Sequence, residues 1–177
     1  LGSSVVSEIA TIEVTPTYDF NGVTCTGNSE TFTITVNPGA QVDPVAGQVL
    51  CVGESTDEIL FTTSNTDGTT TYEWTNNNTA IGLAASGIGD IPSFTATNDT
   101  ASALVATIEV IPTYENGGVT CTGNPETFTI TVLSEISITS FNISDAIDCN
   151  NANSGIIEIT VSGGSGNDEL KINFENS

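Results

Sequence analysis

The sequence contains no histidine, no methionine and only one basic residue, Lys171, whereas 22 of its 177 residues are acidic. Proteins bind nucleic acid by replacing condensed counterions with Lys and Arg, and an anionic membrane surface repels a chain of net charge −21. No apolar run approaches the roughly 20 residues that a membrane-spanning helix needs. We therefore expect neither a nucleic-acid partner nor direct insertion into a membrane.

The missing residue types also remove most catalytic chemistry. Without histidine the chain lacks the commonest general base and transition-metal ligand, and a single lysine leaves little scope for Schiff-base chemistry. Paired carboxylates could serve a glycosidase, but the clefts of such enzymes are rich in aromatic side chains, and this chain has one Trp, three Tyr and seven Phe. We expect a protein that is not an enzyme and that has no cofactor.

The composition that remains favours strands and polar turns. Thr, Ser, Asn and Gly dominate, the aliphatic residues are mainly Val and Ile, and long helix formers are scarce. Apolar and polar residues alternate in several segments, for example at Phe32, Ile34 and Val36, which indicates strands with one buried face. The pattern predicts an all-β chain, with strands near 41–51, 58–63, 70–76, 91–97, 103–114, 126–133 and around 157–161.

An internal repeat organises the sequence. Residues 10–36 (ATIEVTPTYDFNGVTCTGNSETFTITV) align without gaps on residues 106–132 (ATIEVIPTYENGGVTCTGNPETFTITV), with 22 of 27 positions identical at an offset of 96. This offset matches a whole β-sandwich domain of about 100 residues. We predict the C-terminal part of one repeat at 1–37, a complete immunoglobulin-like sandwich at 38–133, and the N-terminal part of a different module at 134–177.

The segment TYEWTNNNTAIGLAASGIGDIPSFTATN, followed by the second copy of the repeat, resembles the PKD-like repeats of very large secreted surface proteins of gliding Bacteroidetes. The tail DCNNANSGIIEITVSGGSG resembles the opening of the SprB repeat, although it has Asn150-Asn151 where that family usually has Gly-Gly. The resemblance implies type IX secretion and display at the cell surface. There the protein would be an adhesive filament for attachment and gliding motility.

Two functions from different classes remain open. The first is a structural and adhesive filament segment, whose partners would be the neighbouring repeats and a surface polysaccharide or substratum. The alternative is a carbohydrate-binding or spacer module attached to a secreted hydrolase.

Cys25 and Cys121 are equivalent under the offset of 96 residues, and Cys51 and Cys149 both precede a small polar turn near the start of a module. Since the resemblance implies export, and exported proteins keep disulfides, we expect a structural role. The preferred pairing is Cys51 with Cys121. The rival pairing is Cys25 with Cys51 and Cys121 with Cys149.

Other candidate residues have structural and functional interpretations. Trp74 alternates like a residue of a central strand, which predicts burial in the core; a sugar-stacking platform is the alternative. The carboxylates that could converge on Ca²⁺ through oxygen ligands are Glu54, Asp57, Glu58, Asp90 and Asp99, and solvated acidic turns are the other interpretation. Asp99-Thr100-Ala101 matches the O-glycosylation pattern that the family resemblance implies, which makes Thr100 a candidate glycosylation site.

Overall fold

The computed structural model describes residues 4–144 and 156–164. In this part of the chain every regular element is a β-strand apart from one short 3₁₀ helix, η1 (Thr79–Ile81), so the predicted all-β class is confirmed. The strands form several sheets, an arrangement consistent with a β-sandwich. Within the described residues no helix has the length and apolar character that crossing a membrane requires.

The chain forms two compact units, each built from three segments. The first unit consists of Leu1–Pro44, Phe61–Glu73 and Val110–Glu126, and the second of Val45–Leu60, Trp74–Glu109 and Thr127–Ser177. Strands β6 (Thr69–Asn76) and β8 (Leu104–Asn116) contribute residues to both. These units do not follow the sequence repeat, so the module boundaries at 37–38 and 133–134 stay a prediction.

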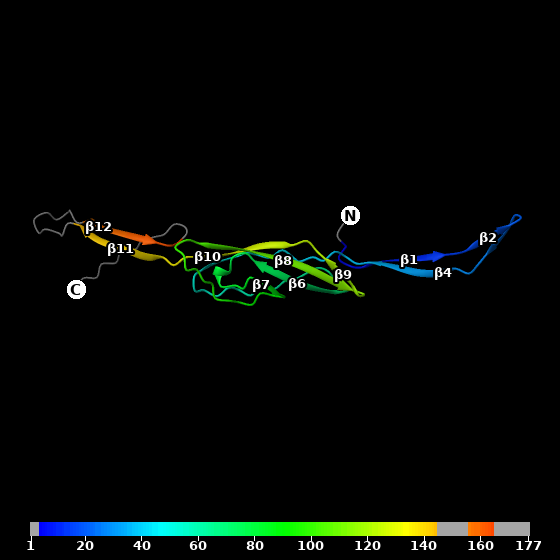
Figure 1. The fold of residues 1–177 in the computed structure, drawn as a ribbon, viewed down its shortest axis with the longest axis horizontal. Coiled ribbons are helices and arrows are strands. Elements are labelled where there is room, and N and C mark those ends of the chain that lie inside the picture. Colours follow the sequence, from blue (N-terminus) through cyan, green and yellow to red (C-terminus); the bar gives the residue numbers. More distant parts are fainter. Residues whose placement is uncertain (1–3, 145–155, 165–177) are drawn as a thin grey trace, which may run out of the picture. The chain divides into compact units, whose positions relative to one another are not determined.

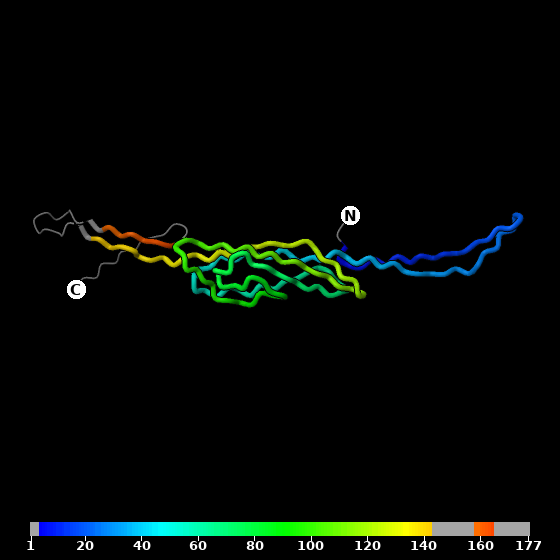
Figure 2. The backbone as a smooth tube through the Cα atoms, viewed as in Figure 1, coloured from blue at the N-terminus to red at the C-terminus, as the bar shows by residue number. Residues whose placement is uncertain are grey.

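Strands β1 to β4 form a long two-stranded ribbon, which we call the N-terminal strand pair (Figures 1 and 2). Strand β1 (Glu8–Val14) pairs antiparallel with β4 (Glu30–Val36), and β2 (Thr17–Phe20) pairs with β3 (Val23–Thr26). The chain reverses at Asn21-Gly22, which have φ values of +49° and +82°. Positive φ at both turn residues is typical of the tight hairpin turn that Asn-Gly favours. All residues of these four strands are exposed.

The second copy of the repeat forms the same strand pair inside a larger sheet. Strands β8, β9 (Val119–Thr122) and β10 (Glu126–Leu133) follow one another, and the β8–β9 register is the β2–β3 register shifted by the 96-residue offset. Here the apolar face is covered: Phe128 is 5% exposed, whereas its first-copy counterpart Phe32 is 51% exposed. The same local sequence is therefore open in one copy and part of a core in the other.

The six-stranded sheet has the order β5-β10-β8-β6-β7, with β9 paired to β8. Strand β5 (Gln48–Cys51) runs parallel to β10, and β7 (Ser86–Ile88) lies at the other edge. The strands predicted at 70–76, 103–114 and 126–133 are confirmed. The prediction at 41–51 is right only for its last four residues, and those at 58–63 and 91–97 are wrong. These two segments contain no extended strand and share one isolated bridge, Ile59↔Ile91; the second segment forms another with Ser55, at Thr95.

Each unit has its own apolar interior. In the second unit Trp74 is 5% exposed, which confirms its predicted burial, and its indole ring lies against Gly87. The other buried apolar residues of that unit are Ile59, Ile81, Leu83, Ile91, Ala96, Ala106, Ile108, Phe128, Ile130 and Val132. In the first unit the rings of Phe61 and Tyr72 are 5.4 Å apart, and Tyr114 is fully buried.

A further strand pair follows β10. Strand β11 (Ser137–Ser144) pairs antiparallel with β12 (Ile156–Ser162), which confirms the strand predicted around 157–161. Gly163 and Gly164 then adopt positive φ, as expected for the turn that the Gly-Gly-Ser-Gly segment predicts. Cys149 and the segment from 165 onward lie outside the described residues.

Candidate interaction site at the base of the N-terminal strand pair

The first unit contains a polar site where the N-terminal strand pair begins and ends. Ser7 directly precedes β1 and Asn37 directly follows β4, so the Glu8↔Val36 pairing places them side by side. The Ser7 hydroxyl donates a hydrogen bond of 3.1 Å to Asn37 Oδ1. We call Ser7 and Asn37 the base of the strand pair.

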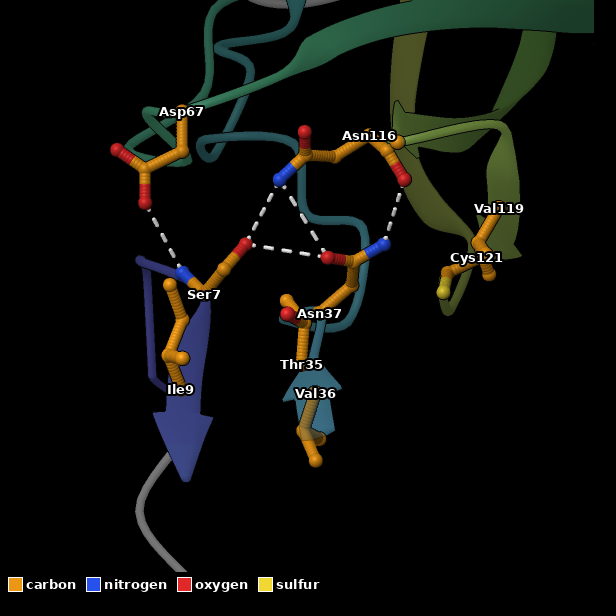
Figure 3. A pocket seen from close by; sticks show the side chains of 10 residues that line it. Ser7, Ile9, Thr35, Val36, Asn37, Asp67, Asn116, Val119 and Cys121 are labelled. Carbon is orange, nitrogen blue, oxygen red and sulfur yellow. Dashed lines mark hydrogen bonds between the residues drawn. The ribbon is translucent and has the colours of Figure 1, made fainter. Parts of the chain in front are cut away.

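Asn116, the last residue of β8, contacts both residues of the base. Its Nδ2 donates to Ser7 Oγ at 2.9 Å and to Asn37 Oδ1 at 3.4 Å. Asn37 Nδ2 in return donates to the carbonyl oxygen of Asn116 at 3.0 Å. Gly117 and Gly118 follow with φ values of +62° and +77°, and this tight turn ends the strand at Asn116. Asn37 and Asn116 are thus joined by two hydrogen bonds, one to the side chain of Asn37 and one to the backbone carbonyl of Asn116 (Figure 3).

A loop before β6 holds the chain that leads into the base. The backbone N–H of Ser7 donates to Asp67 Oδ2 at 3.0 Å, and the N–H of Thr66 donates to the carbonyl of Val5 at 3.1 Å. Asp67 has φ +43°, a left-handed conformation that Asp tolerates better than most residues, and this turn directs its carboxylate at Ser7 (Figure 3). The segment that leads into β1 is therefore held through its backbone as well as through the Ser7 side chain.

These groups surround a recess of about 680 Å³. Its lining consists of Ser7, Ile9, Thr35, Val36, Asn37, Asp67, Asn116, Gly117, Val119 and Cys121. Its polar groups are neutral amides, hydroxyls and one carboxylate, and they bond to one another and to backbone atoms. Such groups position chain segments by complementary hydrogen bonds, and we interpret the site as a junction between strand pairs.

The cysteines do not form the predicted disulfides. Cys25, Cys51 and Cys121 are free thiols, so the Cys51–Cys121 prediction and the rival Cys25–Cys51 pairing are corrected. The cross-strand neighbours are Tyr18 for Cys25, Leu133 for Cys51 and Tyr114 for Cys121. No cysteine of the described strands therefore has another as its cross-strand neighbour, where the Cα–Cα distance would suit a disulfide. Cys149, the remaining candidate, lies outside the described residues.

The candidate calcium ligands do not form a group of three. Among the described residues no group of three or more acidic or cysteine side chains is placed to hold a metal ion, which applies to Glu54, Asp57, Glu58, Asp90 and Asp99. Glu54 instead accepts a hydrogen bond of 2.8 Å from the backbone N–H of Cys51. A carboxylate used locally in this way stabilises a turn.

Thr100 lies exposed in a loop, as its predicted role as a glycosylation site requires. Its hydroxyl donates to the carbonyl of Ser102 at 2.7 Å and is 2.8 Å from Asn98 Oδ1. The buried Asn98 side chain donates to the carbonyls of Ser102 and Val132, both at 2.9 Å. This loop is thereby attached to β10.

No protein-family model matches the chain, and comparisons with curated proteins and with solved structures give no match. The resemblance to PKD-like and SprB repeats therefore stays a prediction.

Sequence reasoning did not identify Ser7, Asn37, Asp67 and Asn116 as site residues. A signal was nevertheless present in the differences between the two copies of the repeat. At the offset of 96 residues Ser7 corresponds to Ala103, Asn37 to Leu133, and Asn116 to Phe20. Of these, Asn116 lies within the aligned copies and is one of the five positions at which they differ, whereas Ser7 and Asn37 lie just outside the aligned segment.

Proposed function

We propose that the chain is a structural and adhesive segment of a long secreted filament at the cell surface, built from tandem immunoglobulin-like, PKD-like sandwiches, with a role in attachment and gliding. The observation that carries this proposal is the hydrogen-bond network of Ser7, Asn37, Asp67 and Asn116. It ties the N-terminal strand pair to the loop before β6 and to the end of β8. Under the predicted domain boundaries these segments belong to successive repeats, and a continuous filament needs such a contact.

The connector after the N-terminal strand pair supports the same proposal because it is bound along its length. Pro38 and Ala40 are buried. Asn65 Nδ2 donates to the carbonyl of Gly39 at 3.0 Å, and the N–H of Asp43 donates to the carbonyl of Thr62 at 2.8 Å. A connector held by such contacts is stiffer than a free Gly/Ser linker.

The pairing of β5 with β10 also suits a protein under tension. Strand β5 is the first strand of the complete repeat, and it runs parallel to β10 with Gln48 opposite Ile130 and Cys51 opposite Leu133. Tension applied before β5 and after β10 acts along the strands in opposite directions. It therefore loads all hydrogen bonds of this pair together, in shear.

Force spectroscopy tests the load-bearing role in a chain whose native cysteines are replaced by serine. The shear pair of handles is Ala46→Cys with Glu135→Cys, and the matched control is Ala46→Cys with Thr127→Cys, all at exposed positions. The control pulls neighbouring ends of β5 and β10 apart and breaks their bonds one after another. We expect the shear geometry to unfold at the higher force. Equal forces in the two geometries would contradict a load-bearing role.

Surface display needs a separate measurement. An antibody raised against residues 38–133 should label intact, unpermeabilised cells of the source organism and should recognise a chain without a catalytic domain. Labelling only after permeabilisation would contradict the filament. Recognition of a secreted hydrolase would favour the accessory-module alternative.

A further inference from the structure

The tip of the N-terminal strand pair carries an apolar surface. Tyr18, Phe20 and Val23 are 66%, 63% and 65% exposed, and together with Asn21 and Cys25 they line a recess of about 480 Å³. Three large apolar side chains this exposed at one hairpin end form the kind of patch that marks an interaction surface. We call these five residues the tip surface.

In the complete repeat, most of the equivalent surface lies next to the base of the N-terminal strand pair. At the offset of 96 residues, Phe20, Asn21, Val23 and Cys25 correspond to Asn116, Gly117, Val119 and Cys121. All four of these counterparts line the recess that contains Ser7 and Asn37, as Figure 3 shows for three of them. The tip of one repeat thus faces the base of the strand pair that precedes it.

We propose that the tip surface receives the base of another strand pair of the same repeat type, one that has apolar residues at the positions of Ser7 and Asn37. This inference rests on the proposed tandem filament and adds to it the chemistry of the neighbour.

The apolar character of the partner follows from the exchange of Asn116 for Phe20. Asn116 supplies the amide donor and the backbone acceptor that satisfy Ser7 and Asn37. A phenylalanine residue keeps the backbone carbonyl but has no side-chain amide, so a Ser/Asn base against it would lose the two hydrogen bonds that Asn116 Nδ2 donates to Ser7 and Asn37. Against Phe20 an apolar base instead removes hydrocarbon from water on both sides.

A base of this chemistry occurs in the chain itself. Ala103 and Leu133 occupy the positions equivalent to Ser7 and Asn37 in the complete repeat. The first copy therefore has a polar base and an apolar tip, and the second copy has an apolar base and a polar tip. If polar tips bind polar bases and apolar tips bind apolar bases, this matching would fix the order of the repeats.

A double-mutant cycle in the full chain tests the matching. The base variant is Ser7→Ala with Asn37→Leu, and the tip variant is Asn116→Phe with Gly117→Asn; each copies the other repeat. Asn is tolerated at position 117 because Asn21 has a positive φ at the equivalent position. The readout is the labelling rate of Cys121 by a thiol reagent, because this half-buried side chain lines the recess. The peptide between Glu115 and Glu126 reports it by mass spectrometry after cleavage at acidic residues.

We expect each variant alone to raise the labelling rate of Cys121 about tenfold, which corresponds to a coupling of about 1.4 kcal/mol. The chain that carries both variants should return to within about twofold of the native rate. Glu115→Asp is the matched control, because it copies the third tip difference, Asp19, and leaves the base contacts unchanged. It should label at the native rate. Trp74 fluorescence verifies that every variant is folded.

A chain lengthened by one repeat tests the tip surface directly. Residues 1–102 are followed by residues 7–177, so that a base now precedes the tip that carries Phe20. The Cys25 of the first tip is replaced by serine, so that the remaining Cys25 lies in the tip preceded by a base. Its labelling should be slower when that base has Ala and Leu than when it has Ser and Asn.

Two results would overturn the matching. The first is that the base and tip variants have additive effects on the labelling rate of Cys121. The second is that Cys25 in the longer chain is labelled at an equal or higher rate behind an apolar base than behind a polar base. Neither result bears on the proposed filament, which the force measurement and surface labelling test separately.

Discussion

Replacing Tyr114 by phenylalanine should stabilise the protein. The Tyr114 side chain is fully buried, and its hydroxyl oxygen has no hydrogen-bond partner among the described residues. A buried polar atom without a partner costs about 1–3 kcal/mol in lost hydration. Removing one oxygen also removes a few dispersion contacts, each worth about 0.1–0.2 kcal/mol. We therefore expect Tyr114→Phe to raise the free energy of unfolding by about 1–2 kcal/mol.

The internal repeat supplies a matched control, because Tyr18 is the counterpart of Tyr114 and is 66% exposed. Water solvates the hydroxyl of Tyr18, so Tyr18→Phe should change the free energy of unfolding by less than about 0.5 kcal/mol. Urea denaturation followed by far-UV circular dichroism measures both variants, with the slope compared to confirm that the transition is the same. A loss of about 1 kcal/mol or more in Tyr114→Phe would refute the reasoning and would indicate that a buried water satisfies the hydroxyl.

Two further substitutions test the packing. Gly68→Ala should lower the free energy of unfolding by about 1–3 kcal/mol, because a Cβ there would lie 2.6 Å from Cζ of Tyr114 and 2.5 Å from the carbonyl oxygen of Glu115. Gly39→Ala is the control, because no atom lies within 4 Å of the added Cβ. It should be neutral or slightly stabilising in the same urea titration. Trp74→Ala should cost about 3–5 kcal/mol. The native protein should show the blue-shifted fluorescence of a buried Trp, and an emission maximum typical of exposed Trp would contradict its placement in the core.

The alternation of apolar and polar residues predicted correctly those strands that have a long neighbouring strand. Residues 70–76, 103–114 and 126–133 alternate between a buried and an exposed face, and each pairs with a long partner. Residues 58–63 and 94–97 alternate too, yet segments 58–63 and 91–97 meet at a single isolated bridge, Ile59↔Ile91. Alternation reports which side chains are buried, whereas a strand also needs a continuous neighbour, and that depends on distant parts of the chain.

The two copies of the repeat make the same point with nearly identical sequence. Ile34 is 49% exposed and Ile130 is fully buried, although both stand in the segment ETFTITV. The strand forms in both copies because local propensity and the Asn-Gly or Gly-Gly turn suffice for a hairpin. Burial requires the other strands of the sheet, which surround only the second copy in this chain. Local sequence therefore predicts the hairpin, and tertiary neighbours decide whether it belongs to a core.

The candidate site was beyond sequence reasoning for a related reason, since Ser7 and Asn116 are 109 residues apart in the chain. Isolated Ser and Asn residues near turns have no distinctive spacing, and most of them are solvated.

Two of the positions at which the copies differ are nevertheless in contact with each other. Thr15 and Ser29 form a hydrogen bond of 2.7 Å, and in the second copy both are replaced by apolar residues, Ile111 and Pro125. When a polar pair in contact changes to an apolar pair, neither side is left with an unsatisfied polar atom. The same physical requirement applies to the base and tip that meet at Asn116. Within this chain, the places where the repeat varies are therefore informative about which surfaces touch.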